Sequence, residues 1–76
     1  IMSEKNYEFT KKFAKHLKLE RIKKDMSQEE LAFKAGISLV AYGAIESGKS
    51  SPKLETVYKI AQALDIEIFK LFIFND

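Results

Sequence analysis

The stretch that decides the fold is MSQEELAFKAGISLVAYGAIESGKSSP, residues 26–52. Ser27 is followed three residues later by Glu30, which is the spacing of a capping box. In that arrangement the serine oxygen accepts from the third amide of a helix, while the glutamate reaches back to the amide of the serine. Gly36 suits the end of the same helix, because no Cβ opposes the positive φ that a C-cap commonly needs. The first half of the stretch therefore predicts a short helix between Ser27 and Gly36.

The second half of the stretch repeats this pattern of start and stop signals. Ser38 is a candidate N-cap, residues 39–47 form the expected helix, and Gly48 ends it. Two short helices joined across Gly36, Ile37 and Ser38 predict a helix-turn-helix unit.

The segments outside this unit are also helical in pattern. Glu8 to Lys24 contains no Gly or Pro, and Phe9, Phe13 and Leu17 recur every four residues as one apolar stripe. After Pro52 and Lys53, a further helix is predicted by the spacing of its apolar residues Leu54, Val57, Ile60, Ala61 and Leu64. Asp65 and Ile66 form a break. Residues 67–74, EIFKLFIF, predict either a short fifth helix or a helix that runs into a strand. The expected fold class is all-α.

Size and composition exclude several classes of protein. A chain of 76 residues fits one small domain of marginal stability. It contains no Cys and a single His, so neither disulfides nor a usual structural zinc site is expected. No segment approaches the roughly 20 apolar residues of a membrane span. We expect a cytoplasmic protein with no metal, cofactor or membrane partner. Ile1 precedes Met2, and we interpret it as a production remnant outside the fold.

Charge is distributed unevenly along the chain. The formal net charge is only +2, which by itself is weak support for a nucleic-acid partner. The first 24 residues, however, carry an excess of basic side chains, and the rest of the chain is mildly acidic. The basic residues of this part are Lys5, Lys11, Lys12, Lys15, Lys18, Arg21, Lys23 and Lys24. This asymmetry permits one side of the domain to face a polyanion.

Three spaced motifs resemble the Cro/λ-repressor-like helix-turn-helix family, also called the XRE family. They are SQEELAFKAGIS (27–38), IESGKSSP (45–52) and LETVYKIAQALDI (54–66), and Arg21 fits as well. The resemblance covers roughly residues 9–70 and implies a compact five-helix DNA-binding domain. We therefore interpret residues 1–8 as an N-terminal extension and 9–76 as the helix-turn-helix domain with a C-terminal apolar dimerisation segment.

The resemblance also implies a function and a set of site residues. It implies a dimeric regulator of transcription, usually a repressor, that binds double-stranded DNA with helix 39–47 in the major groove. Phosphate contacts are implied at the start of the second helix and in the loop after the recognition helix. These residues are Ser27, Gln28, Ser47, Lys49, Ser50 and Ser51. Arg21 and Glu46 match a partly buried structural ion pair.

The base-facing positions depart from the family pattern. They map to Ser38, Leu39, Val40, Gly43 and Ala44, while Tyr42 and Ile45 fall on the core side. Of these five only Ser38 offers a side-chain hydrogen bond, where the family usually places Gln, Arg, Asn, Thr or Ser. Three interpretations stay open: apolar contacts with thymine methyl groups, indirect readout through DNA shape, or a protein interface such as that of an antitoxin-like module. We favour DNA binding, because the flanking phosphate positions are intact.

The C-terminal run is too apolar for a free tail. Part of it closes the core, and the surplus predicts a homodimer seam that includes Ile68, Phe69, Phe72 and Phe74. The chain has no nucleophile elbow, metal constellation or glycine-rich phosphate loop, so we do not expect an enzyme.

Overall fold

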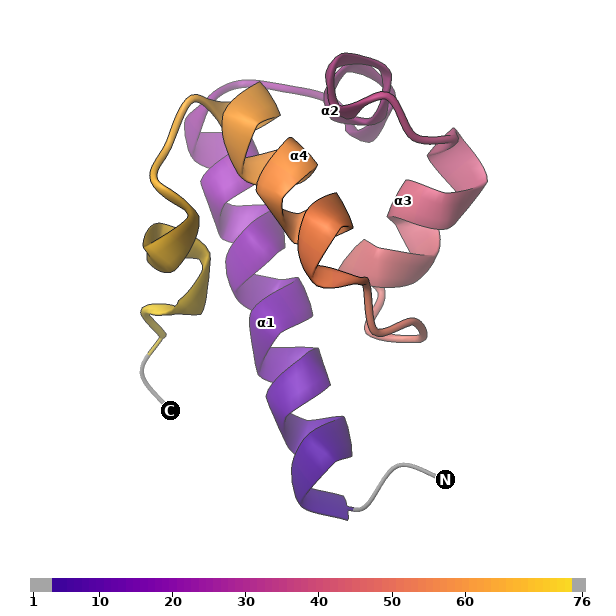
Figure 1. Cartoon of the computed structure of the whole chain (residues 1–76), viewed down its shortest axis with the longest axis vertical. Helices are drawn as coiled ribbons and strands as arrows, with labels where there is room; N and C mark the ends of the chain where they lie inside the picture. Colours follow the sequence, from indigo (N-terminus) through magenta and orange to yellow (C-terminus); the bar gives the residue numbers. More distant parts are fainter. Residues whose placement is uncertain (1–3, 75–76) are drawn as a thin grey trace.

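A computed structural model describes the backbone of residues 4–74 and the side chains of residues 7–74. Within that range the chain forms four α-helices and one short 3₁₀-helix and no strand, so the expected all-α class is confirmed. The elements are α1 (Glu4–Lys23), α2 (Gln28–Ala35), α3 (Leu39–Glu46), α4 (Leu54–Leu64) and η1 (Ile68–Phe72). Figure 1 shows α1 running most of the length of the molecule, with η1 on the left of it in this view and α4 and α3 on the right. No helix in residues 4–74 is long and apolar enough to cross a membrane.

The core is formed where α1, α2, α3 and α4 meet. Phe13 and Leu17 supply the α1 side of it, as the apolar stripe predicts. The other buried residues of the core cluster are Leu31, Ala32, Ala35, Tyr42, Ile45, Val57, Ile60, Ala61, Leu64 and Leu71. Because α2 and α3 have only eight residues each, their stability depends on this shared packing rather than on helix propensity.

The ends of α2 confirm the sequence signals. The amide of Glu30 donates to Ser27 Oγ at 3.0 Å, and the amide of Ser27 donates to Glu30 Oε1 at 3.1 Å, which completes the capping box. Gly36 adopts a left-handed φ of 73°, and its amide donates to carbonyls of the last turn. The tight turn between α2 and α3 depends on this conformation, which a Cβ would strain.

The ends of α3 follow the same logic. Ser38 Oγ accepts a hydrogen bond from the amide of Ala41 at 3.0 Å, so Ser38 is the N-cap. The helix ends at Glu46, one residue earlier than expected, with Ser47 as its C-cap. Gly48 follows with a φ of +79° and turns the chain toward α1.

The N-terminal boundary differs from the one expected. Helix α1 begins at Glu4, so residues 4–8 of the expected extension belong to the helix; Ile1 lies outside the described residues. The side chain of Phe9, placed in the apolar stripe by its spacing, is 52% exposed. Figure 1 shows the N-terminal part of α1 projecting beyond α3 and α4, and the Phe9 ring contacts Phe72 and Phe74 near the C-terminus. The spacing of apolar residues predicts which face of a helix is buried, but not how far along that helix the neighbouring elements pack.

The C-terminal segment forms a shorter helix than expected. The predicted fifth helix is a 3₁₀-helix of five residues, and the alternative of a helix that runs into a strand is wrong within the described residues. Asp65 ends α4 in a left-handed conformation with a φ of 58°, which Asp tolerates better than most residues. The turn brings η1 back against α1, where Leu71 is completely buried.

Candidate nucleic-acid interface

The outward face of α3 is an exposed, mostly apolar ridge. Val40 is 84% exposed and Leu39 is 47% exposed, while Gly43 and Ala44 are half-buried at the same surface. Ser38 is exposed at the start of the ridge, but its oxygen already accepts the capping bond from Ala41. The five positions expected to face bases thus lie at the surface. The hydroxyl of Ser38 is the one polar side-chain group among them, and it already accepts a hydrogen bond within the protein.

The inward face of α3 is buried. Tyr42 has no exposed surface, which confirms that its ring belongs to the core. Its hydroxyl is buried as well and donates to the Glu46 carboxylate one turn later. Burial without this partner would leave the phenol unsatisfied, at a cost of about 1–3 kcal/mol.

Glu46 is the centre of a hydrogen-bonded ion cluster that joins three helices. Arg21 of α1 donates from Nε to Glu46 Oε2 at 2.8 Å and from Nη2 to Oε1 at 2.9 Å, a bidentate pair. Arg21 also donates from Nη1 to the carbonyl of Met26 at 2.7 Å, in the loop before α2. Gln28 of α2 donates from Nε2 to Glu46 Oε1 at 2.9 Å. The ion pair implied by the resemblance is therefore present, with more partners than the sequence indicated.

Electrostatics follow from this geometry. Burial by itself would raise the pKa of Glu46, but hydrogen bonds from Arg21, Tyr42 and Gln28 outweigh it and hold that pKa below its usual value. The hydrogen bond to Glu46 raises the pKa of Arg21, against the effect of its own burial. Burial, followed by the bond to Glu46, raises the pKa of Tyr42. The cluster thus contains a fixed anion, a fixed cation and a neutral phenol.

Gln28 is positioned differently from the expectation of a side chain directed at phosphate. Its amide nitrogen is bound to Glu46, and the residue is half-buried. One of its two N–H groups is committed to that bond, which leaves the second N–H and the backbone amides of the first turn. Ser27 is exposed, and its side chain is held in the capping box. At this end of α2 the backbone, more than the side chains, is available to an anion.

The loop after α3 is held tightly by its backbone. The amides of Lys49 and Ser50 donate to the carbonyl of Ala44 at 3.0 and 3.2 Å. Ser47 Oγ donates to the same carbonyl at 3.1 Å. Lys49 and Ser51 are exposed and Ser50 is half-buried. The loop therefore presents Lys49 from a fixed backbone at the C-terminal end of the ridge.

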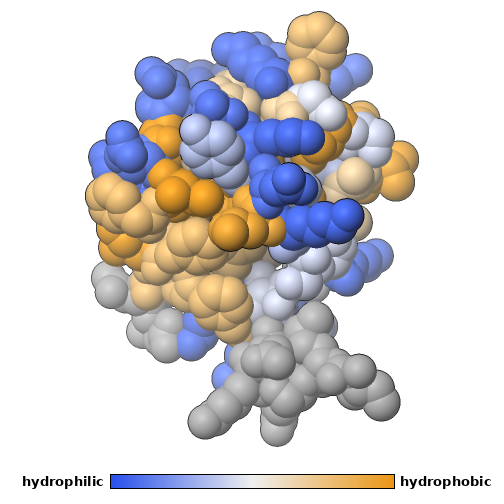
Figure 2. Space-filling view, in the orientation of Figure 1, coloured by the Kyte–Doolittle hydropathy of each residue, from blue (hydrophilic) through white to orange (hydrophobic). Residues whose placement is uncertain are grey.

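The residues expected at the dimer seam are divided between surface and core. Phe69 and Phe72 are exposed, whereas Ile68 and Phe74 are half-buried against the core. Figure 2 shows apolar side chains gathered on the left of the view, over η1 and the adjoining part of α4. The ring of exposed Phe9 stacks on Phe72, with centroids 6.5 Å apart.

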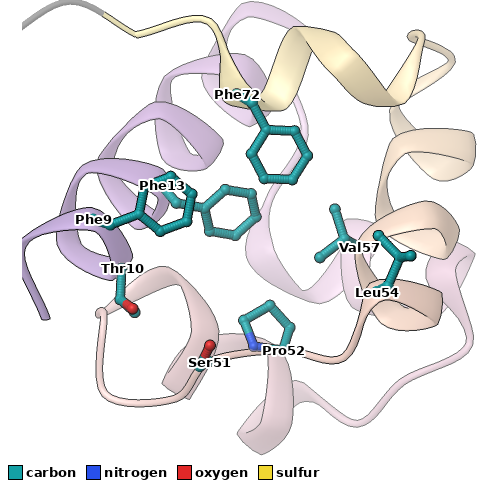
Figure 3. Close-up of a pocket in the computed structure, with 8 residues that line it drawn as sticks. All are labelled: Phe9, Thr10, Phe13, Ser51, Pro52, Leu54, Val57 and Phe72. Carbon is teal, nitrogen blue, oxygen red and sulfur yellow. The ribbon is translucent and has the colours of Figure 1, made fainter. Parts of the chain in front are cut away.

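A shallow hollow of about 190 Å³ borders this apolar surface. Figure 3 shows that α1, the loop after α3, α4 and η1 all contribute to it. Its lining residues are Phe9, Thr10, Phe13, Ser51, Pro52, Leu54, Val57 and Phe72. The exposed aromatic surface thus adjoins the end of the loop that carries Lys49.

A capped helix, a tight glycine turn and a second helix exposed along one face define a helix-turn-helix domain. Comparison with known proteins agrees: the helix-turn-helix family model HTH_3 matches residues 17–71. The chain belongs to this family.

Curated proteins and solved structures are similar to this chain in sequence and in fold. An uncharacterised HTH-type transcriptional regulator of Archaeoglobus fulgidus is 45% identical over 56 residues, which are 74% of this chain and 80% of the relative. The cryptic phage CTXphi transcriptional repressor RstR of Vibrio cholerae is 43% identical over 51 residues, 67% of this chain and 46% of the repressor. The crystal structure of the restriction-modification controller protein C.AhdI from Aeromonas hydrophila superposes with a TM-score of 0.81 at 40% identity, covering 83% of this chain and 96% of that one.

Sequence reasoning missed two members of the ion cluster. The spacing of Tyr42 and Glu46, four residues apart on one helix, was a usable signal, since residues at i and i+4 share a face. The Gln28 contact with Glu46 joins residues 18 apart in different helices. Nothing local in the sequence marks such a pair.

Proposed function

We propose that this protein is a sequence-specific DNA-binding regulator of transcription that places α3 in the major groove. The observation that carries the proposal is the exposed ridge of Leu39 and Val40, framed by the start of α2 and by the loop with Lys49. A helix in the major groove needs such a protruding face, and phosphate donors beside it fix its register. We propose a cytoplasmic, non-enzymatic role, in keeping with the family.

We propose that bases are read by apolar contact. Val40 and Leu39 offer methyl groups, and the thymine methyl is the apolar feature of the major groove. Gly43 and Ala44 keep the neighbouring surface low, so the helix backbone can approach the groove floor closely. The remaining discrimination comes from phosphate contacts of Ser27, Gln28, Ser47, Lys49, Ser50 and Ser51, which sense DNA shape through the backbone.

The test is selection of bound duplexes from a random pool. We expect enrichment of a symmetric, thymine-rich motif. If no sequence is enriched, and no binding to duplex is detected at low salt, the ridge is a protein interface instead. The exposure of Val40 would suit that role equally.

A substitution in the loop tests the phosphate contacts. We expect Lys49→Ala to weaken binding to all duplexes similarly and to lower the slope of log affinity against log salt by about 0.9, because one phosphate contact is lost. Fluorescence anisotropy across a salt series measures both quantities. An unchanged slope would contradict the role of Lys49.

We propose that the protein acts as a homodimer through the C-terminal apolar surface. Ile68, Phe69, Phe72 and Phe74 are concentrated in one short segment, and Phe69 and Phe72 keep much of their ring surface in water in the isolated chain. Burial of apolar surface contributes about 25 cal/mol per Å², and symmetric operators suit a two-fold protein.

Sedimentation tests the dimer. We expect a dimer at micromolar concentration and a shift toward monomer for Phe69→Ala, since that ring is exposed and contributes little to the folded monomer. The exposed Phe33 of α2 supplies the control, because Phe33→Ala removes a similar ring far from η1 in the chain. A wild-type protein that sediments only as a monomer would refute the dimer.

A further inference from the structure

The N-terminal half of α1 lies beside the loop that follows α3. The position that a Cβ would occupy on Gly48 is 3.5 Å from Cγ and 3.6 Å from Cα of Lys11. The same position is 3.8 Å from Cβ of Ala14, on the next turn of α1. Gly48 therefore allows the loop to pack directly on α1, and Lys11 is next to the backbone that presents Lys49.

The ammonium group of Lys11 is held in a defined place. Its Nζ lies over the ring of Tyr7, 4.9 Å from the ring centroid, which is a cation–π contact. Tyr7 precedes Lys11 by one turn, and both side chains are exposed. The contact directs the charge along α1 away from the core and limits the rotamers that Lys11 populates in water.

Other cations share this face of α1. Lys15 and Lys18 follow Lys11 at helical spacings of four and seven residues and are both exposed. Lys11 is the lysine next to Gly48 in the loop after α3, and among the described side chains its ammonium group lies over an aromatic ring. Tyr7 and Lys11 lie before residue 17, where the match to the family model begins.

We propose that Lys11, positioned by Tyr7, is a further contact to the phosphate backbone of duplex DNA, so that the binding edge continues from Lys49 onto α1. This inference rests on the proposed function, because it places the same duplex against the same loop. A lysine whose rotamers are already restricted loses less entropy when a phosphate replaces water. Tyr7 is the positioning residue, and Lys11 is the residue that contacts DNA.

The experiment measures affinity for a short duplex of random sequence across a salt series, with the full chain. Backbone contacts do not depend on sequence, so no operator is needed. We expect Lys11→Gln to lower the salt slope by about 0.9, as for one lost phosphate contact. Lys59→Gln is the matched control: it removes the same charge from an exposed position on α4, and we expect a much smaller change in slope.

Two variants test the role of Tyr7. Tyr7→Phe keeps the aromatic face and should bind as the wild type does. Tyr7→Leu removes the face and should weaken binding by about two- to fivefold at low salt, in line with a surface cation–π contact. A merely structural role would instead change thermal stability, which circular dichroism monitors for each variant.

The outcomes separate this inference from the function on which it rests. If the wild type binds duplex and Lys49→Ala lowers the slope, but Lys11→Gln behaves like Lys59→Gln, the contact on α1 is refuted and the proposed function stands. If Tyr7→Leu binds as tightly as Tyr7→Phe, the positioning role is refuted. If the wild type binds no duplex at any salt concentration, both proposals are refuted together.

Discussion

The two faces of α3 differ in how strongly the rest of the molecule constrains them. On the inward face, Tyr42 and Glu46 are buried and every polar group of the pair has a partner from α1, α2 or α3 itself. On the outward face, Leu39 and Val40 are exposed, and a Cβ added at Gly43 would have no neighbour within 4 Å. One eight-residue helix therefore combines a face fixed by the fold with a face that the fold leaves open to variation.

This difference explains how an apolar recognition helix is compatible with a stable domain. The position of α3 depends on the Arg21–Glu46 pair and on the buried ring of Tyr42, neither of which lies among the residues that face outward. Ser38, which caps the helix, is the one outward residue that the fold also uses. The outward residues are thus free to meet the demands of a partner. The exposure of these apolar side chains to water is unfavourable, and binding of a partner would bury them.

The largest expected effect is on the inward face. Glu46→Ala should lower the free energy of unfolding by up to roughly 3–5 kcal/mol, because half-buried Arg21 would lose its carboxylate partner and the buried Tyr42 hydroxyl would lose its acceptor. Urea denaturation at neutral pH measures the change. Glu29→Ala, which removes an exposed carboxylate from α2, is the control and should cost less than about 1 kcal/mol. Similar costs for the two variants would mean that the cluster does not determine the position of α3.

Acid should act through the same carboxylate. Because the folded-state pKa of Glu46 is below its ordinary value of 4.5, ionised Glu46 stabilises the fold at every pH above that value. This stabilisation is lost as the pH falls through the folded-state pKa. We therefore expect the free energy of unfolding to fall below about pH 4.5, and to fall less steeply in Glu46→Gln, where the titrating group is absent. Parallel pH profiles for the two proteins would contradict this assignment.

The smallest effect is expected on the outward face and should have opposite signs for stability and binding. Gly43→Ala should raise the free energy of unfolding by up to about 1 kcal/mol, because glycine is unfavourable inside a helix and the new Cβ meets no neighbour. The same methyl group should weaken DNA binding, since it stands between the helix backbone and the groove floor. Thermal melting and anisotropy measure the two changes. A stabilised variant with unaltered affinity would show that close approach at Gly43 is not needed.

The elements themselves were predictable because their signals are local. Ser27 with Glu30 predicted the capping box, and Gly36 predicted the end of α2 with the conformation that it adopts. Ser38 predicted the start of α3. Each of these residues hydrogen-bonds with groups within four positions of itself, so both partners can be recognised in one short stretch of sequence.

What sequence reasoning missed depends on contacts between distant segments. The exposure of Phe9 follows from where α1 outruns its neighbours, and the engagement of Gln28 follows from how α2 meets Glu46. The contact of Lys11 with Gly48 joins residues 37 positions apart by chain number. The sequence therefore predicted which positions of the site face outward. It did not predict which of the side chains at the site already make hydrogen bonds within the protein.

The independence of the outward face from the Glu46 cluster has a practical consequence. Leu39, Val40 and Ala44 form a short cassette that can be exchanged for polar side chains with little effect on folding. A library of variants at these positions would yield domains that bind new half-sites, and every variant would keep the same scaffold of α1, α2 and α4.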